Sequence, residues 1–146
     1  MDVAALRKRI LRELERPGAV MPTSADRRAA GDTARQQFSR LLDTTIVPLL
    51  KQTADILKAE GALCRLHTPS DHAQLAFDRS AEDFIEIMLD TATPPRVIGR
   101  SSVRRKGGTL VEDRIIGVGR EIDEISDEDV VSYLLPELRK IVTAKT

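Results

Sequence analysis

The chain has little of what most readily indicates a function. Its 146 residues include one cysteine, two histidines and no tryptophan. The aromatic residues are Phe38, Phe77, Phe84 and Tyr133, too few to stack nucleic-acid bases or to line an aromatic pocket. Because the single cysteine, Cys64, cannot form an intramolecular disulfide, it fits a reducing compartment, and we expect a cytoplasmic protein.

Net charge is also absent, since 23 basic residues balance 23 acidic ones. No global field therefore attracts nucleic acid or an anionic membrane. No apolar run is long enough to span a bilayer, and the first 18 residues mix charges with apolar residues, unlike a signal peptide. We expect no membrane association and a single domain over residues 1–146, long enough to fold without a disulfide or a metal.

Residues 1–61 are predicted to form two helices. The first carries leucines and isoleucine on one face and ends before Pro17. The second is predicted over 24–60, and Thr23 and Asp26 have the spacing of a capping box at its start.

The second helix is long for a chain of this size. About 35 helical residues extend roughly 50 Å, whereas the radius of gyration of such a domain is about 15 Å. We predict a kink near Pro48, because proline lacks an N–H and crowds the carbonyl of Thr44, and we expect Gly61 to end the helix. The apolar stripe repeats every three or four residues and runs through Phe38, Leu42, Ile46, Leu49, Thr53 and Ile56.

From residue 62 the hydrophobic period changes to two, which predicts an antiparallel meander of about five strands over 62–122. If residues 68–71 form the first loop, Leu66 lies opposite Ala73 and Cys64 opposite Leu75. The same reasoning places Leu75 opposite Ile87 in the next pair. Apolar residues then share one buried face.

A further hairpin is predicted around a basic and glycine-rich turn, and two registers remain open. With Lys106 and Gly107 as the loop, the pairs are Ile98 with Ile115, Arg100 with Asp113 and Val103 with Leu110. A five-residue loop instead pairs Val97 with Ile115 and Arg100 with Glu112.

The last element is predicted to be a helix over 126–145. Ser126 and Asp129 have capping-box spacing, and acids in the first turn suit the helix dipole. The apolar stripe is Val131, Leu134, Leu135, Leu138, Ile141 and Val142. The fold class is therefore α+β, with the C-terminal helix packed on the sheet.

One cluster contains metal-binding or nucleophilic side chains, namely Cys64, His67, Asp71 and His72. Alternation along a strand places Cys64 and His67 on opposite faces, so a Cys–His catalytic pair is not predicted. His67 and His72, facing each other with Asp71, are weak candidates for a metal site, and a pair of surface histidines is the simpler interpretation.

A second candidate is the basic stretch Arg96, Arg100, Arg104, Arg105 and Lys106. These side chains could contact an acidic partner surface or phosphates. A solvated hairpin tip explains them more simply, because a tight turn needs glycine and charged tips keep loops soluble. The acidic stretch 121–129 lacks the calcium-loop pattern and is better explained by helix capping.

No nucleophile elbow, phosphate-binding loop or zinc-protease motif is present, and no cofactor is predicted. We therefore predict a non-enzymatic protein-binding or scaffold domain, most simply a homodimer joined by the stripe Phe38, Leu42, Ile46 and Leu49, by a sheet edge, or by both. One alternative is a small-ligand-binding or enzymatic domain with a pocket between helices and sheet, using Arg65, Gln74 or the histidines. Another is a nucleic-acid accessory protein using residues 96–106.

Overall fold

The computed structural model describes residues 2–14, 23–92 and 94–143. The chain divides into two compact parts, Met1–Ala30 and Gly31–Thr146, and the second contains the whole sheet. Helices are followed by a five-stranded antiparallel sheet and a final helix, so the predicted α+β class is confirmed. The single domain over residues 1–146 stays a prediction.

In the first part, α1 spans Val3–Leu14, and its exposed apolar side chains are Val3, Leu6, Ile10 and Leu11. The predicted capping box starts the next helix: the Thr23 N–H donates to Asp26 Oδ2 (3.1 Å) and the Asp26 N–H donates to Thr23 Oγ1 (3.0 Å). These hydrogen bonds lower the pKa of Asp26. The predicted helix end before Pro17 lies outside the described residues.

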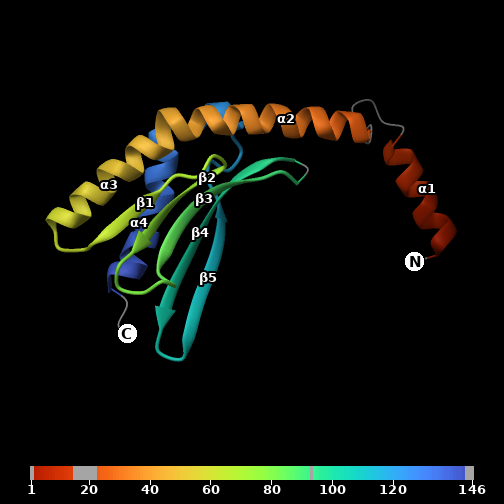
Figure 1. The fold of residues 1–146 in the computed structure, drawn as a ribbon. Helices are drawn as coiled ribbons and strands as arrows, with labels where there is room; N and C mark the ends of the chain where they lie inside the picture. Colours follow the sequence, from red (N-terminus) through yellow and green to blue (C-terminus); the bar gives the residue numbers. More distant parts are fainter. Residues whose placement is uncertain (1, 15–22, 93, 144–146) are drawn as a thin grey trace. The chain divides into compact units, whose positions relative to one another are not determined.

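The long helix has three segments: α2 (Ser24–Leu41), a π-helical turn η1 (Leu42–Ile46) and α3 (Val47–Ala59). It changes direction between α2 and α3 (Figure 1). The Val47 N–H donates to the carbonyl of Leu42, five residues back. This wider turn lies where the Pro48 ring would otherwise crowd the carbonyl of Thr44. The predicted kink near Pro48 is confirmed, and Gly61 ends the helix with a φ of 90°.

The sheet is a simple meander in which each strand pairs with the next along the chain (Figure 1). Its strands are β1 (Cys64–His67), β2 (His72–Phe77), β3 (Phe84–Asp90), β4 (Arg96–Arg105) and β5 (Gly108–Ile115). A 3₁₀ turn, η2 (Ile122–Glu124), then leads to α4 (Asp127–Thr143).

The register of the last hairpin follows the first of the two predicted alternatives, with Arg100 opposite Asp113. The predicted registers of the first two hairpins are wrong by two residues. Leu66 lies opposite Leu75, Cys64 opposite Phe77, and Leu75 opposite Ile85. A shift of two leaves every side chain on its predicted face, because side chains alternate with a period of two.

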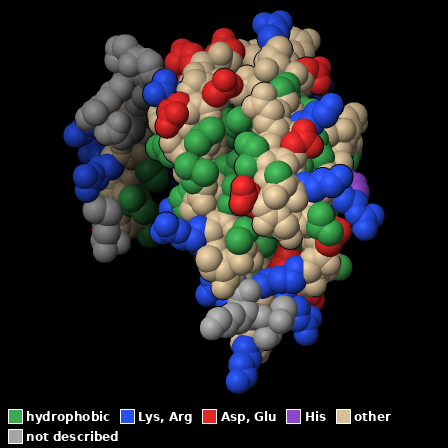
Figure 2. All heavy atoms as spheres, turned by 90° about the vertical axis from the view of Figure 1, so that its left-hand side faces the viewer, with side chains coloured by type: hydrophobic (Ala, Val, Ile, Leu, Met, Phe, Trp, Pro, Cys, Tyr) green, Lys and Arg blue, Asp and Glu red, His purple; other side chains and the backbone are tan. Residues whose placement is uncertain are grey.

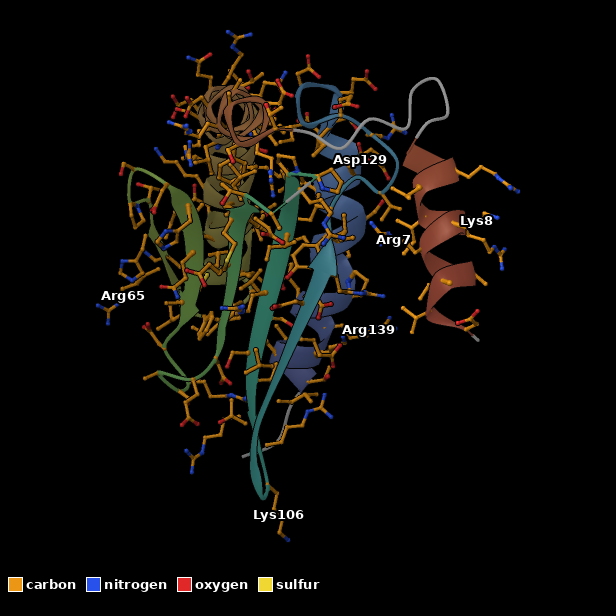
Figure 3. All side chains as sticks on the ribbon, turned by 90° about the vertical axis from the view of Figure 1, so that its right-hand side faces the viewer. Arg7, Lys8, Arg65, Lys106, Asp129 and Arg139 are labelled. Atoms are coloured by element: carbon orange, nitrogen blue, oxygen red, sulfur yellow. The ribbon has the colours of Figure 1, made fainter. Side chains whose placement is uncertain are left out.

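One face of the sheet, here the covered face, packs against η1, α3 and α4 (Figure 1). Its core residues are Ala73, Leu75, Phe77, Ile85, Ile87, Val97 and Val103. The opposite side, here the open face, carries mixed polar and apolar side chains such as Gln74, Glu86, Met88 and Arg100. Arg65 projects from this open face, opposite α4 (Figure 3).

The C-terminal helix begins with the predicted capping box: the Ser126 N–H donates to Asp129 Oδ2 (2.9 Å) and the Asp129 N–H donates to Ser126 Oγ (3.3 Å). Its buried stripe differs from the predicted one and consists of Val130, Tyr133, Leu134, Glu137 and Ile141. Leu135 and Val142 are exposed instead. The prediction is confirmed for Leu134 and Ile141, which are buried, and for Leu138, which packs against the core; it is wrong for Leu135 and Val142 and omits Tyr133 and Glu137, because it counts apolar residues only.

Candidate functional site

The most accessible part of the sheet is its last strand, β5. In the described part of the chain β5 has β4 on one side and no strand on the other. Seven of its eight residues are exposed, and Glu112 is half-buried. Such an edge presents unpaired backbone groups to any extended chain that approaches it.

The direction of these backbone groups follows from one hydrogen bond. The Ile116 N–H donates to the Val97 carbonyl (2.9 Å), and these two residues lie opposite each other in the register. In an antiparallel pair, residues that bond to the neighbouring strand alternate with residues that do not. The residues of β5 that direct N–H and C=O groups outward are therefore Thr109, Val111, Asp113 and Ile115.

Apolar side chains accompany this free edge. Leu110 and Ile115 are each 39% exposed and Val111 is 53% exposed. Val111 and Ile115 lie on the open face, and Leu110 lies on the covered face, where side chains at even-numbered positions of β5 point. The edge thus combines unpaired backbone groups with apolar contact area.

A hollow of about 600 Å³ lies beside the second half of β5, where the strand passes the first turns of α4. Its lining includes Arg114, Ile116, Val118, Ser132 and Tyr133. Tyr133 is only 6% exposed, and its hydroxyl has no hydrogen-bond partner among the described residues. Burial, with the nearby Glu137 carboxylate second, raises the pKa of Tyr133.

The position of Tyr133 depends on a glycine in β4. A Cβ atom built on Gly99 would lie 2.1 Å from Cζ of Tyr133, so only glycine lets the ring approach the strand this closely. The ring therefore rests directly on the sheet next to β5.

Beneath β5, on the covered face, a charged network joins the strand to α4. Glu137 is fully buried; it accepts from Ser101 Oγ (3.1 Å) and lies 3.0 Å from Lys140 Nζ. Lys140 also contacts Glu112 (3.1 Å), and Arg114 contacts Glu137 (3.4 Å). The hydrogen bonds to Glu137 and then to Glu112 raise the pKa of Lys140 against the effect of desolvation.

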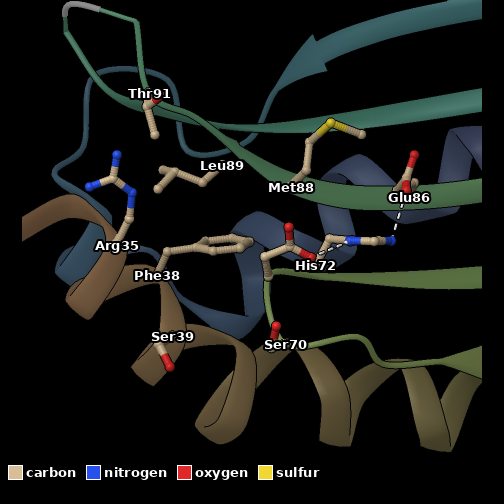
Figure 4. Close-up of a pocket in the computed structure, with 10 residues that line it drawn as sticks. Arg35, Phe38, Ser39, Ser70, His72, Glu86, Met88, Leu89 and Thr91 are labelled. Atoms are coloured by element: carbon tan, nitrogen blue, oxygen red, sulfur yellow. Dashed lines mark hydrogen bonds and ion pairs between the residues drawn. The ribbon is translucent and has the colours of Figure 1, made fainter. Parts of the chain in front are cut away.

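A separate pocket of about 430 Å³ lies between the end of α2 and the sheet (Figure 4). Phe38, Met88 and Leu89 provide apolar surface, and the polar side chains come from Arg35, Ser39, Ser70, Asp71, His72, Glu86 and Thr91. The predicted alternative placed a pocket between helices and sheet. His72 is the one residue named for it that lines this pocket; Arg65, Gln74 and His67 do not.

His72 lies between two carboxylates (Figure 4). Its Nδ1 is 2.8 Å from Asp71 Oδ1, and its Nε2 is 3.1 Å from Glu86 Oε1. The hydrogen bond from His72 lowers the pKa of Asp71. Because both ring nitrogens are occupied by carboxylates, this histidine is not arranged as the base for a nucleophile.

The weak metal candidates are not brought together as predicted. His67 lies opposite Gln74 and His72 opposite Met88, so the two histidines do not face each other. Among the described residues no group of three or more His, Cys, Asp or Glu side chains is placed to hold a metal ion. Cys64 is half-buried, and burial, with Asp78 second, raises the pKa of its thiol.

The basic stretch lies on β4 and at the tip of the last hairpin, where Lys106 projects (Figure 3). Its first three members face acids: Arg100 makes two hydrogen bonds to Asp113 (2.8 and 3.0 Å). Arg104 contacts Glu82 (2.9 Å) and Arg96 lies 4.0 Å from Asp90. Arg105 and Lys106 have no acidic partner among the residues that the structure describes, and two cations at a hairpin tip favour the interpretation as a solvated hairpin.

The helical stripe predicted as an oligomer interface is used within the chain. Phe38, Leu42 and Ile46 are buried in the core, and Leu49 is half-buried against it. These side chains pack in the same core as the sheet residues, and both η1 and α3 contact the sheet. Most of this stripe is therefore buried within the chain, and its role as an oligomer interface stays a prediction.

Exposed apolar side chains also occur at Ile56 on α3, at Leu63 after it, and at Leu135 and Val142 on α4. In the view of Figure 2, hydrophobic side chains gather near the middle of the face and charged ones surround them. Helices satisfy their backbone groups internally, so α3 and α4 can offer a partner side chains alone. β5 can offer backbone hydrogen bonds as well.

Sequence reasoning found the strand β5 but missed its surroundings. The positions of Tyr133 and Glu137 four residues apart, on the phase of Val130, Leu134 and Ile141, carried the signal that both are buried. Gly99 gave a second signal, since a glycine inside a strand often marks a close approach by another group.

Comparison with protein-family models, with curated proteins and with solved structures finds no match to this chain. Among the described residues, no helix has both the length and the apolar character needed to cross a membrane.

Proposed function

We propose that this chain is a non-enzymatic protein-binding domain that works as a homodimer joined through the free edge of β5. The observation that carries the proposal is the exposure of this eight-residue strand, with outward backbone groups at Thr109, Val111, Asp113 and Ile115. A long, exposed edge is a template on which another strand can pair. Two-fold pairing of identical edges covers both at once.

Binding rather than catalysis is also the better account of the polar groups. The fully buried acids, Asp83 and Glu137, each bind basic or hydroxyl groups of the fold. The histidine in the pocket has both nitrogens engaged. We place the protein in the cytoplasm, because its single half-buried cysteine suits a reducing compartment.

The proposal is tested by Val111→Pro. Val111 directs its N–H outward, so proline there removes a hydrogen bond to the second copy but none to β4. Sedimentation equilibrium of the unmodified protein is expected to give twice the chain mass of 16.2 kDa. The variant is expected to weaken dimerisation at least tenfold, with an unchanged circular dichroism spectrum.

Val111→Thr is the matched control, because threonine keeps both the β-branched shape and the outward N–H. This variant should remain dimeric. A protein that stays monomeric at high concentration contradicts the proposal, and so does a Val111→Pro variant that dimerises as well as the unmodified chain.

A second candidate function, small-ligand binding, is favoured by the pocket at His72. Its volume of about 430 Å³ is in the usual range for small-molecule sites, and it joins an apolar wall to the charged Arg35. Benzoate, which has an aromatic ring and a carboxylate, is a suitable probe. Titration should shift the amide signals of Ser70 and Thr91 in NMR spectra, and Arg35→Gln should abolish the shifts; unchanged spectra in the unmodified protein count against this function.

A further inference from the structure

We infer the register of the dimer: β5 pairs antiparallel with β5 of the second copy, and Asp113 lies opposite its own counterpart on the two-fold axis. This inference rests on the proposed function and specifies it. Outward-facing residues of one strand must meet outward-facing residues of the other, because only these have free N–H and C=O groups. The central positions that satisfy this condition with useful overlap are 111, 112 and 113.

Side-chain pairing separates these three registers. An axis at Glu112 sets two glutamates directly opposite each other, and each has a single contact to a Lys140 that it shares with Glu137. An axis at Val111 sets Glu112 against the apolar Leu110. Like charges directly opposite destabilise a sheet, and a carboxylate gains nothing from an apolar neighbour. Both registers therefore place Glu112 badly.

An axis at Asp113 pairs the strand well on both faces. On the open face Val111 meets Ile115 of the second copy, and both side chains are exposed in the single chain. On the covered face Glu112 meets Arg114 of the second copy. Symmetry makes each of these pairs occur twice, which gives two apolar contacts and two ion pairs.

This register brings the two Asp113 side chains close together at the two-fold axis, where like charges repel each other. Each carboxylate already accepts two hydrogen bonds from Arg100 of its own chain, at 2.8 and 3.0 Å. These hydrogen bonds lower the pKa of Asp113, so the pair stays ionised with its cation beside it. Two neutral Arg–Asp pairs therefore meet at the axis rather than two bare charges.

The same register accounts for the hollow beside β5. Leu110 of the second copy falls opposite Ile116, which lines that hollow together with Tyr133. Leu110 lies on the covered face, is partly exposed in the single chain, and points toward the hollow in this pairing. The space of about 600 Å³ accommodates its side chain.

Single cysteines at positions 111, 112 and 113 test the register, each in a Cys64→Ala background that removes the native thiol. Residues on the axis lie opposite their counterparts at a Cα separation of about 5.5 Å, within the range of a disulfide. Val111 lies opposite Ile115 of the second copy, so the two Val111 residues are offset by four positions, or about 13 Å along the strand. Diamide oxidation should therefore link Asp113→Cys into covalent dimers at least tenfold faster than Val111→Cys.

The outcomes distinguish the register from the proposed function. Fastest linking at position 111 or 112, in a protein that is dimeric, overturns the register and leaves the β5 dimer standing. A dimer that links at none of the three positions overturns both. Val111 and Asp113 are exposed and Glu112 is half-buried, and equal thermal melting of the reduced variants shows that the fold is unchanged.

Discussion

The two edges of the sheet differ in length and in what they present. β1 has four residues and β5 has eight. At β1 the Asp78 N–H donates to the Leu63 carbonyl (3.1 Å), so by alternation only Cys64 and Leu66 direct backbone groups outward. In β5 twice as many residues direct their backbone groups outward. A strand added at β5 can therefore form twice as many backbone hydrogen bonds as one added at β1.

The support beneath the two edges differs as well. β1 lies against α3, and its outward residues Cys64 and Leu66 are half-buried against the core. β5 is held from below by charged contacts from Arg114 and Glu112 to α4. The chain protects one edge by shortening and covering it. It leaves the other long and holds it in place, which is the arrangement expected of a binding edge.

The largest expected effect comes from removing the acid beneath β5, with Glu137→Ala. The change leaves Lys140 and Arg114 without their shared carboxylate and opens a gap against Ser101. Breaking a buried ion pair by removing one partner costs about 3 kcal/mol or more. Urea denaturation should show this loss, and hydrogen exchange should rise more in β5 than in β1.

Glu137→Gln is the control for shape, since the amide can still accept from Ser101 but carries no charge. The unfolding free energy of Glu137→Gln should lie between those of Glu137→Ala and the unmodified chain. A loss below about 1 kcal/mol in Glu137→Ala, the level typical of surface ion pairs, would mean that the charged network does not hold β5 to α4.

A smaller effect is expected at Asp83, which joins the inner strands and belongs to neither edge. It is fully buried, accepts from Arg79 Nε (2.6 Å) and accepts from the Arg104 N–H (2.7 Å). Burial alone would raise the pKa of Asp83, but these donors outweigh it and the pKa is lowered. Asp83→Asn should cost about 2 kcal/mol at pH 7.

The sign of the pH dependence follows from the lowered pKa. Ionised Asp83 stabilises the fold above its unfolded pKa of about 3.9, and this stabilisation is lost as the pH falls through its folded pKa. The difference in unfolding free energy between the unmodified chain and Asp83→Asn should therefore decrease below about pH 4. An exposed acid, Glu121, changed to glutamine is the control, and a gap that stays constant to pH 2 would contradict the assignment.

The fold could be predicted from the sequence to the extent that periodicity and local chemistry specify it. The capping boxes at Thr23 and Ser126 and the kink at Pro48 depend on neighbouring residues and were confirmed. The first two registers depended on loop length, and a slip of two residues keeps Leu75 and Ile85 on the covered face. Hydrophobic pattern cannot detect such a slip.

The candidate site was harder to predict, because it depends on contacts between distant segments. Glu137 is as polar as the exposed Glu128, and only the meeting of α4 with β4 and β5 buries it. The sequence predicts the stripe around Leu42 but gives no position for the sheet residues that share its core, so its burial within the chain could not be predicted. The sequence predicts a sheet edge among the possible interfaces, but which edge is long and exposed follows only from the strand order.

The smallest effect expected is a difference between two cross-strand ion pairs on the open face. At the β5 side Arg100 binds Asp113 through two hydrogen bonds, whereas at the β1 side Arg65 Nε lies 3.4 Å from Asp78 in a single contact. Double-mutant cycles with alanine should give a coupling of about 0.5 to 1 kcal/mol for the first pair. The cycle for Arg65 and Asp78 should give no coupling above experimental error. Adding 1 M salt should reduce the coupling between Arg100 and Asp113. Equal couplings would mean that the longer edge is held no more firmly than the shorter one, and the contrast between the edges would then rest on backbone groups alone.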